Sequence, residues 1–304
     1  LEGEAADLIG LINAHGCPVV AVDIPSGIHG DSGEIMGIAL MAKHTVTFAA
    51  KKPGHLLVPG KMYAGKVSVA DIGIGKLGLG LGKEERHASL APALLFENHP
   101  GFWRENIPWP DAVSNKYTRG KALVVGGGIA STGAARLSAV AALRIGAGYV
   151  SVACDRESLP VYASHLTSVV TEVADNAAEF SKAIADARVR AVLVGPGNGV
   201  NQKTKHYVSL TLAKKVPTVL DADALSVFAN EAATLKEMIQ APAILTPHEG
   251  EFTRLFPSPI GGGPGWGHGG HSASHAPLPS SPLLGEGKMK RAHEAARFMN
   301  AVVV

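Results

Sequence analysis

Short apolar runs alternate with helix-length segments from residue 120 to the end of the chain. The segment 132–145 repeats small and apolar residues at helical spacing, starts at the potential capping residues Ser131 and Thr132, and stops at Gly146. Because strands that alternate with helices usually pair in parallel, this pattern predicts a parallel sheet covered by helices. The strands expected here are 122–125, 149–153, 191–194, 218–220 and 243–245.

The same pattern occurs earlier in the chain. The strands expected there are 18–22, 45–49 and 67–72. Residues 76–113 interrupt the pattern with closely spaced Gly and Pro and are interpreted as a linker between two α/β units. The segment 258–287 is so rich in Gly, Pro and Ser that we expect a disordered insertion. Helical spacing resumes at 288–299, and the run 301–304 has the character of a strand.

The composition is that of a globular protein, because 46% of the 304 residues are hydrophobic and 18% are charged. A formal net charge of +2 gives no long-range attraction to nucleic acid or to an anionic membrane, so neither is expected as a partner. No run reaches the roughly 18 apolar residues of a membrane-spanning helix. Cys17 and Cys154 match no metal or redox spacing. We therefore expect a cytoplasmic protein with two buried thiols.

Five polar or Gly-rich segments follow predicted strands, at the edge where open parallel sheets bind ligands. Three of them have a structural alternative. The segment 22–27 is also a good turn, 126–133 could serve tight packing alone, and the two acids in 221–225 could bind a magnesium-nucleotide or cap a helix, of which capping is the commoner outcome. The segment 195–199 removes side chains where a ligand could lie. The last segment, 245–252, combines a hydroxyl, an imidazole and two carboxylates. Five such loops are hard to explain by packing alone.

With these segments identified, the chain resembles the bifunctional NAD(P)H-hydrate repair enzymes. In that family an NAD(P)HX epimerase domain precedes a ribokinase-like, ADP-dependent NAD(P)HX dehydratase domain. The order and spacing of the segments carry the resemblance. The segments that match the epimerase are 22–27, 31–33, 45–54, 63–65 and 71–73, and those that match the dehydratase are 115–121, 132–150, 195–199, 221–225 and 245–252.

The resemblance implies an α/β architecture in two partial domains. The later half of a Rossmann-like epimerase domain would occupy 1–75, followed by the linker at 76–113. The first two thirds of a ribokinase-like dehydratase domain, with a mainly parallel sheet, would occupy 114–304 and contain the insertion at 258–287. The implied function is the repair of hydrated nicotinamide cofactors. Repair would combine epimerisation of R- and S-NAD(P)HX with ADP-dependent dehydration of (6S)-NAD(P)HX to NAD(P)H.

The resemblance also implies roles for residues in the epimerase-like part. Asp23 falls where the family binds the hydrated cofactor, and Ser26 falls where the family contributes to a potassium site. The implied co-substrate is ADP, and the implied ions are Mg²⁺ and K⁺. A homo-oligomer is compatible with these expectations.

In the dehydratase-like part, Ala134, Gly197 and His248 fall where the family contacts the S-form of the hydrated cofactor. Asp223 and Glu251 are further candidates for the polar part of this site. These five residues come from four of the loops that follow predicted strands.

The chain departs from the family pattern at both ends. The family's Asn-Asn-Gly-Gly-Asp-Gly loop and its later Gly-Thr-Gly-Asp motif, which supplies the catalytic Asp, have no counterpart within 1–304. We therefore expect a sequence cut at both ends, with no catalytic residue of its own and no useful turnover. The alternative is a non-catalytic, nucleotide-binding remnant of the same fold. A dinucleotide-dependent dehydrogenase is disfavoured, because Ser131 stands where the GxGxxG fingerprint needs its third glycine.

Overall fold

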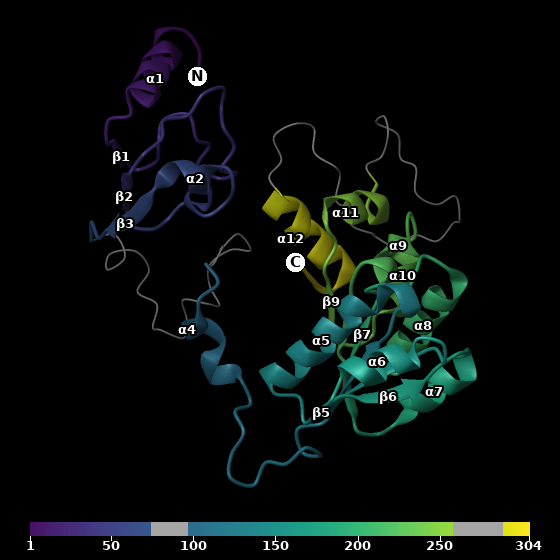
Figure 1. Cartoon of the computed structure of the whole chain (residues 1–304). Coiled ribbons are helices and arrows are strands. Elements are labelled where there is room, and N and C mark those ends of the chain that lie inside the picture. The colour runs from purple at the N-terminus through teal and green to yellow at the C-terminus, as the bar shows by residue number, and fades with distance from the viewer. Residues whose placement is uncertain (74–96, 258–287) are drawn as a thin grey trace, which may run out of the picture. The chain divides into compact units, whose positions relative to one another are not determined.

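The computed structural model describes residues 1–73, 97–257 and 288–304 (Figure 1). The chain divides into two compact units. Unit 1 comprises the described residues of Leu1–Pro108 and Gly285–Lys288, and unit 2 comprises the described residues of Trp109–Leu284 and Met289–Val304. The expected insertion at 258–287 and most of the expected linker lie outside the described residues.

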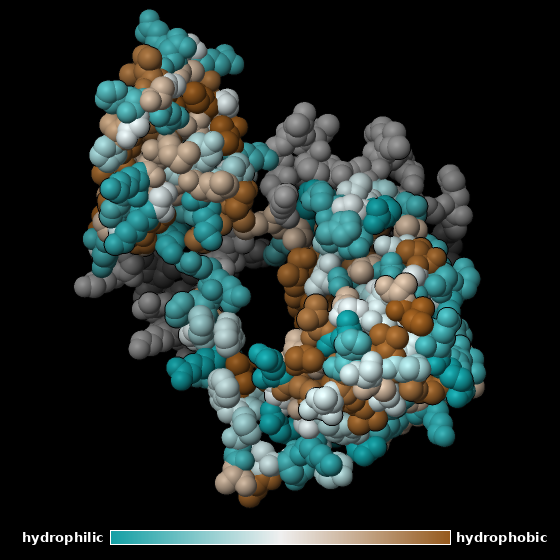
Figure 2. Space-filling model, in the orientation of Figure 1, coloured by the Kyte–Doolittle hydropathy of each residue, from teal (hydrophilic) through white to brown (hydrophobic). Residues whose placement is uncertain are grey.

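Unit 1 is built on a small parallel sheet with the strand order β1-β2-β3. Its elements are α1 (Glu4–His15), β1 (Val20–Val22), β2 (His44–Phe48), η1 (Pro53–His55), α2 (Gly60–Ala64), β3 (Lys66–Ala70), α4 (Pro100–Trp103) and η3 (Arg104–Asn106). Apolar side chains remain on its surface: Leu11 is 69%, Val20 65% and Val22 70% exposed. Figure 2 shows hydrophobic residues among polar ones on the visible face of this unit.

In the described residues of unit 2, most strands are separated by helices. Its elements are β4 (Lys121–Val125), η4 (Ile129–Ser131), α5 (Thr132–Ile145), β5 (Tyr149–Cys154), α6 (Leu159–His165), β6 (Val170–Val173), α7 (Ala177–Ala185), β7 (Val189–Val194), α8 (Gln202–Ala213), β8 (Thr218–Leu220), α9 (Asp223–Ser226), α10 (Ala232–Met238), β9 (Ala243–Leu245), α11 (Glu249–Leu255), α12 (Lys288–Met299) and β10 (Val302–Val303).

The sheet of unit 2 has the order β10-β9-β8-β7-β4-β5-β6, and every neighbouring pair is parallel. The strand order changes direction between β4 and β7, so these neighbours form a topological switch point. One face of the sheet packs against α5 and α6, where Val124 and Val152 meet Ala135 and Tyr162. The opposite face carries the larger core, with residues of α7, α8 and α10–α12 (Figure 1).

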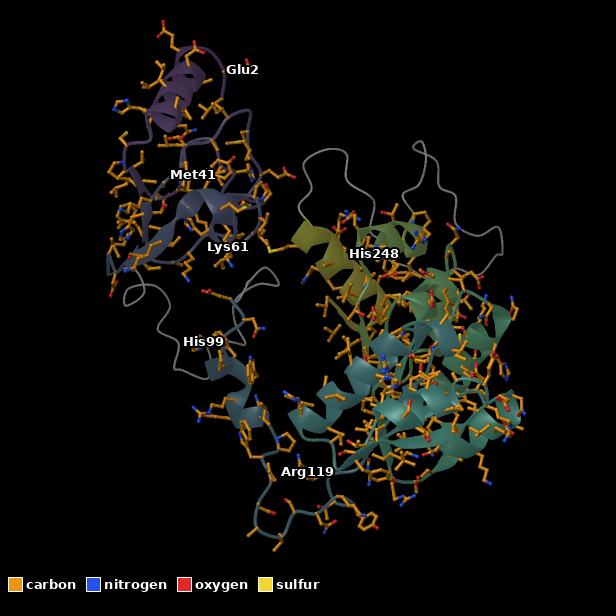
Figure 3. All side chains as sticks on the ribbon, viewed as in Figure 1. Glu2, Met41, Lys61, His99, Arg119 and His248 are labelled. Atoms are coloured by element: carbon orange, nitrogen blue, oxygen red, sulfur yellow. The ribbon has the colours of Figure 1, made fainter. Side chains whose placement is uncertain are left out.

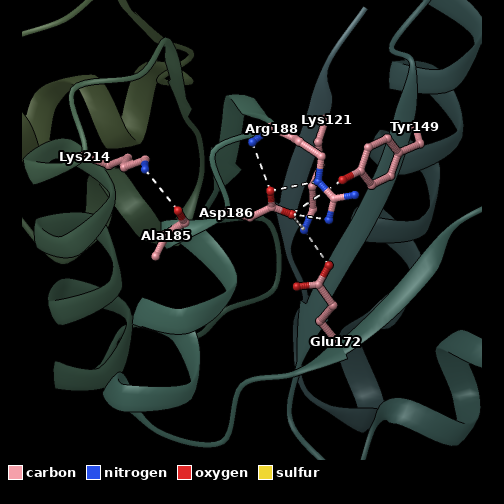
Figure 4. Close-up of polar contacts among 7 residues, drawn as sticks. All are labelled: Lys121, Tyr149, Glu172, Ala185, Asp186, Arg188 and Lys214. Carbon is pink, nitrogen blue, oxygen red and sulfur yellow. Dashed lines mark hydrogen bonds and ion pairs between the residues drawn. The ribbon is translucent and has the colours of Figure 1, made fainter. Parts of the chain in front are cut away.

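An ion cluster closes the amino edge of this sheet (Figure 4). The buried Lys121 ammonium lies 2.5 Å from Glu172 Oε1 and 3.4 Å from Asp186 Oδ2. Arg188 donates from Nε and Nη2 to the two oxygens of Asp186, at 2.9 Å each. These hydrogen bonds hold the pKa of the Asp186 carboxyl well below its usual range. The charged groups at the amino edge are therefore paired with one another.

The prediction of an α/β protein with parallel sheets is confirmed, and the expected strands and the helix 132–145 lie within one to two residues of the observed elements. The helix ends as expected, at Gly146 in the left-handed conformation with φ 119°. The expectation of two buried thiols is wrong for one of them. Cys154 is buried in β5, but Cys17 is exposed, because it follows the surface helix α1 and its glycine cap.

Candidate functional site

The Gly-rich loop after β4 packs tightly against neighbouring backbone. A side chain at Gly127 would place its Cβ 2.3 Å from the carbonyl oxygen of Gly197, a distance that real Cβ atoms do not reach. The buried Tyr162 hydroxyl donates to the Gly127 carbonyl at 3.0 Å. Ser131 was expected to cap the following helix, but its side chain makes no capping bond. Its hydroxyl instead donates to the Gly197 carbonyl at 2.8 Å.

The loop after β7 needs its glycines for backbone conformation. Gly195, Gly197 and Gly199 all have positive φ, at 126°, 73° and 80°. A Cβ at Gly195 would lie 1.7 Å from the carbonyl oxygen of Asp221, and one at Gly197 would lie 2.6 Å from that of Ser131. These glycines are therefore required by the close packing of this loop against the neighbouring loops.

The two acids after β8 tie the neighbouring loops together. Asp221 Oδ1 accepts from the Thr246 hydroxyl at 2.7 Å, and Asp223 Oδ2 accepts from the Gly199 amide at 2.7 Å. Asp223 thus begins helix α9 without capping it. Among the described residues, no group donates to the second oxygen of either carboxylate. Between them stands Ala222, a non-glycine residue with φ 48°, which marks a strained backbone position.

His248 lies at the start of α11, as Figure 3 shows. Its Nδ1 accepts from the amides of Gly250 and Glu251, at 3.0 and 3.4 Å, so the neutral ring carries its proton on Nε2. Glu251 Oε2 accepts from the His248 amide at 3.0 Å, and Oε1 lies 3.2 Å from Nε2. The side chain of Glu251 is only 8% exposed, whereas that of His248 is 67% exposed. The carboxylate therefore orients the ring, and the ring is the group that a ligand can reach.

Ala134, Gly197 and His248 all lie at the carboxyl edge of the sheet of unit 2. Ala134 is in the exposed first turn of α5, beside Gly133, where a Cβ would meet nothing within 4 Å. Three polar contacts join neighbouring loops at this edge. Ser131 bonds to Gly197 in the loop after β7, and Asp223 in the loop after β8 bonds to Gly199 in that same loop. Asp221 bonds the loop after β8 to Thr246 in the loop after β9. The described part of this edge thus combines accessible backbone, two half-bonded carboxylates and an exposed imidazole.

Asp23 is the centre of a second polar cluster, in unit 1. It has a positive φ of 69°, and its Oδ1 accepts from the Thr47 hydroxyl at 2.9 Å and from the Lys52 ammonium at 2.5 Å. The buried His55 ring donates from Nε2 to the Asp23 carbonyl at 2.8 Å. The Lys52 hydrogen bond lowers the pKa of the Asp23 carboxyl, so it is an anion at neutral pH. The sequence did not predict Thr47, Lys52 and His55 as partners of Asp23, although Thr47 and Lys52 lie in the segment 45–54 that matches the epimerase.

Ser26 is exposed, and its carbonyl oxygen accepts from the Leu40 amide at 2.9 Å. Across the described ranges, no group of three or more His, Cys, Asp or Glu side chains is placed to hold a metal ion. No helix in the described part of the chain has the length and apolar character to cross a membrane.

Unit 2 is thus a parallel α/β protein whose candidate ligand site lies at the carboxyl edge of its sheet. A family model described as NAD(P)H-hydrate dehydratase matches residues 122–304, and one described as YjeF-related protein N-terminus matches residues 1–54. The chain belongs to the NAD(P)H-hydrate dehydratase family.

Two curated relatives, both named bifunctional NAD(P)H-hydrate repair enzyme, cover most of the chain. The protein from Salinibacter ruber is 37% identical over 258 residues, which is 82% of this chain and 46% of that protein. The protein from Moorella thermoacetica is 34% identical over 263 residues, or 84% of this chain and 48% of that protein. The chain therefore spans about half the length of the curated relatives it matches.

Among solved structures, the ADP/ATP-dependent NAD(P)H-hydrate dehydratase of Bacillus subtilis, co-crystallised with ATP and Mg²⁺, shares 30% sequence identity. The match covers 52% of this chain and 56% of that chain, with a TM-score of 0.40.

Proposed function

We propose that this chain is part of an enzyme that repairs hydrated nicotinamide cofactors. Unit 2 contributes to ADP-dependent dehydration of (6S)-NAD(P)HX, and unit 1 contributes to interconversion of the two C6 epimers. We assign 1–75 to the epimerase domain, 76–113 to the linker and 114–304 to the dehydratase domain. The observation that carries the proposal is the set of linked loops at one sheet edge, where a family of this activity is matched over 122–304.

The residues of unit 2 would bind and orient the hydrated cofactor. The exposed first turn of α5 around Ala134, where a Cβ at Gly133 would meet nothing within 4 Å, suits the approach of a pyrophosphate or a ring hydroxyl to the backbone. His248 would contact the ligand through the exposed face of its ring, with Glu251 holding Nε2 in place. Asp223 would act through its second oxygen, while its first oxygen fixes the Gly199 amide.

The reaction assigned to unit 2 removes water from the hydrated ring. A ring hydroxyl is a poor leaving group, so transfer of the terminal phosphoryl group of ADP to its oxygen would leave AMP and create a better one. Loss of phosphate from the ring, together with a proton from the neighbouring carbon, then restores the dihydronicotinamide. Phosphoryl transfer depends on positioning and on charge neutralisation, which Mg²⁺ supplies when bound. The available oxygens of Asp221 and Asp223 are of the type that Mg²⁺ prefers.

In unit 1, we propose that Asp23 contacts the hydrated cofactor and that Ser26 contributes an oxygen to a K⁺ site. The anionic carboxylate of Asp23 is held by Thr47 and Lys52, so its orientation is fixed before any ligand arrives. A fixed carboxylate beside a lysine is suited to hydrogen bonding with a ribose or a ring hydroxyl.

The test is to titrate the purified chain with (6S)-NADHX, with the R epimer and with intact NADH. We expect saturable binding of the S epimer, weakened by His248→Ala and left unchanged by His165→Ala, a histidine at the end of α6. Adding ADP and Mg²⁺ while following recovery of the dihydronicotinamide absorbance tests turnover in the same samples. Binding without turnover favours the remnant of the same fold, and absence of binding contradicts the proposal.

A further inference from the structure

The two Gly-rich loops of unit 2 leave the sheet toward opposite faces. After β4 the chain enters α5, which packs on the face that contains Val124 and Val152. After β7 it enters α8, whose Tyr207 and Val208 pack on the other face. Open α/β sheets bind their ligands outside the carboxyl ends of neighbouring strands whose connections diverge in this way. The two loops must keep a fixed position relative to each other if such a ligand site is to keep its shape.

The Asn198 side chain spans this divergence with both ends of its amide. Its Nδ2 donates to the Gly126 carbonyl at 2.9 Å and to the Val125 carbonyl at 3.2 Å, both at the end of β4. Its Oδ1 accepts from the Gly195 amide at 2.8 Å, at the end of β7. One side chain therefore satisfies three backbone groups on the two strands that flank the switch point.

The chemistry of these contacts requires an amide. A leucine or an alanine at this position would leave the Gly195 amide and both carbonyls without the partner that Asn198 supplies. A carboxylate would keep the acceptor for Gly195 but would point a negative oxygen at two carbonyl oxygens. The backbone of Asn198 is itself fixed, because its carbonyl accepts from the Thr204 hydroxyl at 3.0 Å. The Thr204 hydroxyl thus fixes the backbone of Asn198, while the Asn198 side chain holds the Gly-rich loop.

We propose that Asn198 is a positioning residue that clamps the Gly126–Gly128 loop to the loop after β7 and so fixes the relative position of the two loops at the candidate ligand site. Asn198 acts through the backbone of its neighbours and needs no contact with the reacting atoms. The consequence for ligand affinity rests on the proposed function, whereas the clamp itself is a property of the free protein.

Asn198→Asp tests the clamp, because its effect depends on pH. When the introduced carboxyl is ionised it cannot donate to Gly126. When it is protonated, its hydroxyl can donate again while its carbonyl accepts from Gly195. The two carbonyl oxygens raise the pKa of this carboxyl from its ordinary value of about 3.9 and the Gly195 amide lowers it, so recovery is expected as the pH falls from about 7 toward about 4. The readout is the hydrogen-exchange protection of amides in 126–131, compared with wild type at each pH.

We expect roughly tenfold lower protection in Asn198→Asp near neutral pH and recovery on acidification, as loss of neutral hydrogen bonds would give. Asn198→Ala should show the loss without the recovery. Asn176→Asp is the matched control, since Asn176 serves as an acceptor for the Ala178 and Glu179 amides and an aspartate keeps that role. Unchanged protection in both Asn198 variants, or loss in Asn198→Asp that acid does not reverse, would overturn the clamp.

Titration with (6S)-NADHX separates this inference from the proposed function. If the wild-type chain binds the S epimer, Asn198→Asp should weaken binding roughly tenfold near neutral pH and recover affinity on acidification relative to wild type. Wild-type affinity in Asn198→Asp at neutral pH would contradict the role of Asn198 in shaping the ligand site. If the wild-type chain does not bind the S epimer, the proposed function fails, and the exchange measurement still decides whether Asn198 is a clamp.

Discussion

Removal of the buried Tyr162 hydroxyl should weaken ligand binding by more than the loss of folding stability explains. Tyr162 is fully buried in α6, and its hydroxyl donates to the Gly127 carbonyl in the Gly-rich loop at 3.0 Å. Tyr162→Phe keeps the aromatic ring in the core and deletes only this hydrogen bond. The loop would then lose the contact that fixes it from the side of α6.

The size of the effect follows from the chemistry of the lost contact. A net hydrogen bond between neutral groups contributes about 1 kcal/mol, and a buried acceptor left without a donor costs up to about 3 kcal/mol. We therefore expect the free energy of unfolding of Tyr162→Phe to fall by about 1–3 kcal/mol. Burial raises the pKa of Tyr162 to about 12, so the hydroxyl remains a neutral donor at any pH used for the assay.

The chain contains a matched control in Tyr207. Its hydroxyl also donates to a backbone carbonyl, that of Ala174, at 2.7 Å, and burial raises its pKa to about 12. Ala174 follows β6, at the end of the sheet remote from β7–β9. Tyr207→Phe should therefore lose a similar amount of stability without disturbing the Gly-rich loop.

Urea unfolding and titration with (6S)-NADHX measure the two properties separately. Both variants should show a lower unfolding midpoint with an unchanged m-value. Only Tyr162→Phe should bind the S epimer more weakly, by roughly tenfold. If both variants bind the S epimer equally weakly, the reasoning is refuted, because the loss of affinity would then follow from the general loss of stability.

Three further predictions concern other parts of the chain. Gly195→Ala should prevent stable folding of unit 2, because its Cβ would lie 1.7 Å from a backbone oxygen at φ 126°, whereas Gly133→Ala should raise the unfolding midpoint, since nothing lies within 4 Å of its Cβ. Asp186→Asn should lower the free energy of unfolding at pH 7 and have progressively less effect below pH 3.8. The reason is that a carboxyl whose pKa is lowered by folding stabilises the fold above its ordinary pKa of 3.8, and this contribution disappears as the group is protonated. Acid unfolding curves of the variant and the wild type measure the difference. A thiol reagent should label Cys17 in the native chain but not Cys154, whose burial raises its pKa to about 11; rapid labelling of both would contradict the assignment.

The periodic part of the fold could be predicted because it depends on local patterns. The strands 218–220 and 243–245 and the helix 132–145 follow from short apolar runs and from a glycine stop. The strand β6 (Val170–Val173) was not predicted, since it is an edge strand in which Thr171 and Glu172 interrupt the apolar run. Helix α8 was also not predicted, because its polar residues mask the buried side of the helix.

The candidate site was predictable in position but not in its contacts. Parallel strands place their carboxyl ends at one edge, so the loops containing Gly197 and His248 were expected together. The partners of Ser131 and Asp223 could not be predicted, since each bonds a residue on a different strand connection. Local chemistry favoured capping for both residues, and tertiary contacts replaced it. The role of Asn198 likewise depends on a contact 72 residues away in sequence.

The most direct test of the central claim is to map where the hydrated cofactor binds. Hydrogen exchange of the chain should be measured with and without saturating (6S)-NADHX, and peptides from both edges of the sheet of unit 2 should be compared. The account predicts protection in 126–134, 195–199 and 246–251, with no change around Lys121 and Asp186 at the amino edge. Protection at the amino edge, or no protection at the carboxyl edge under saturating ligand, would contradict it.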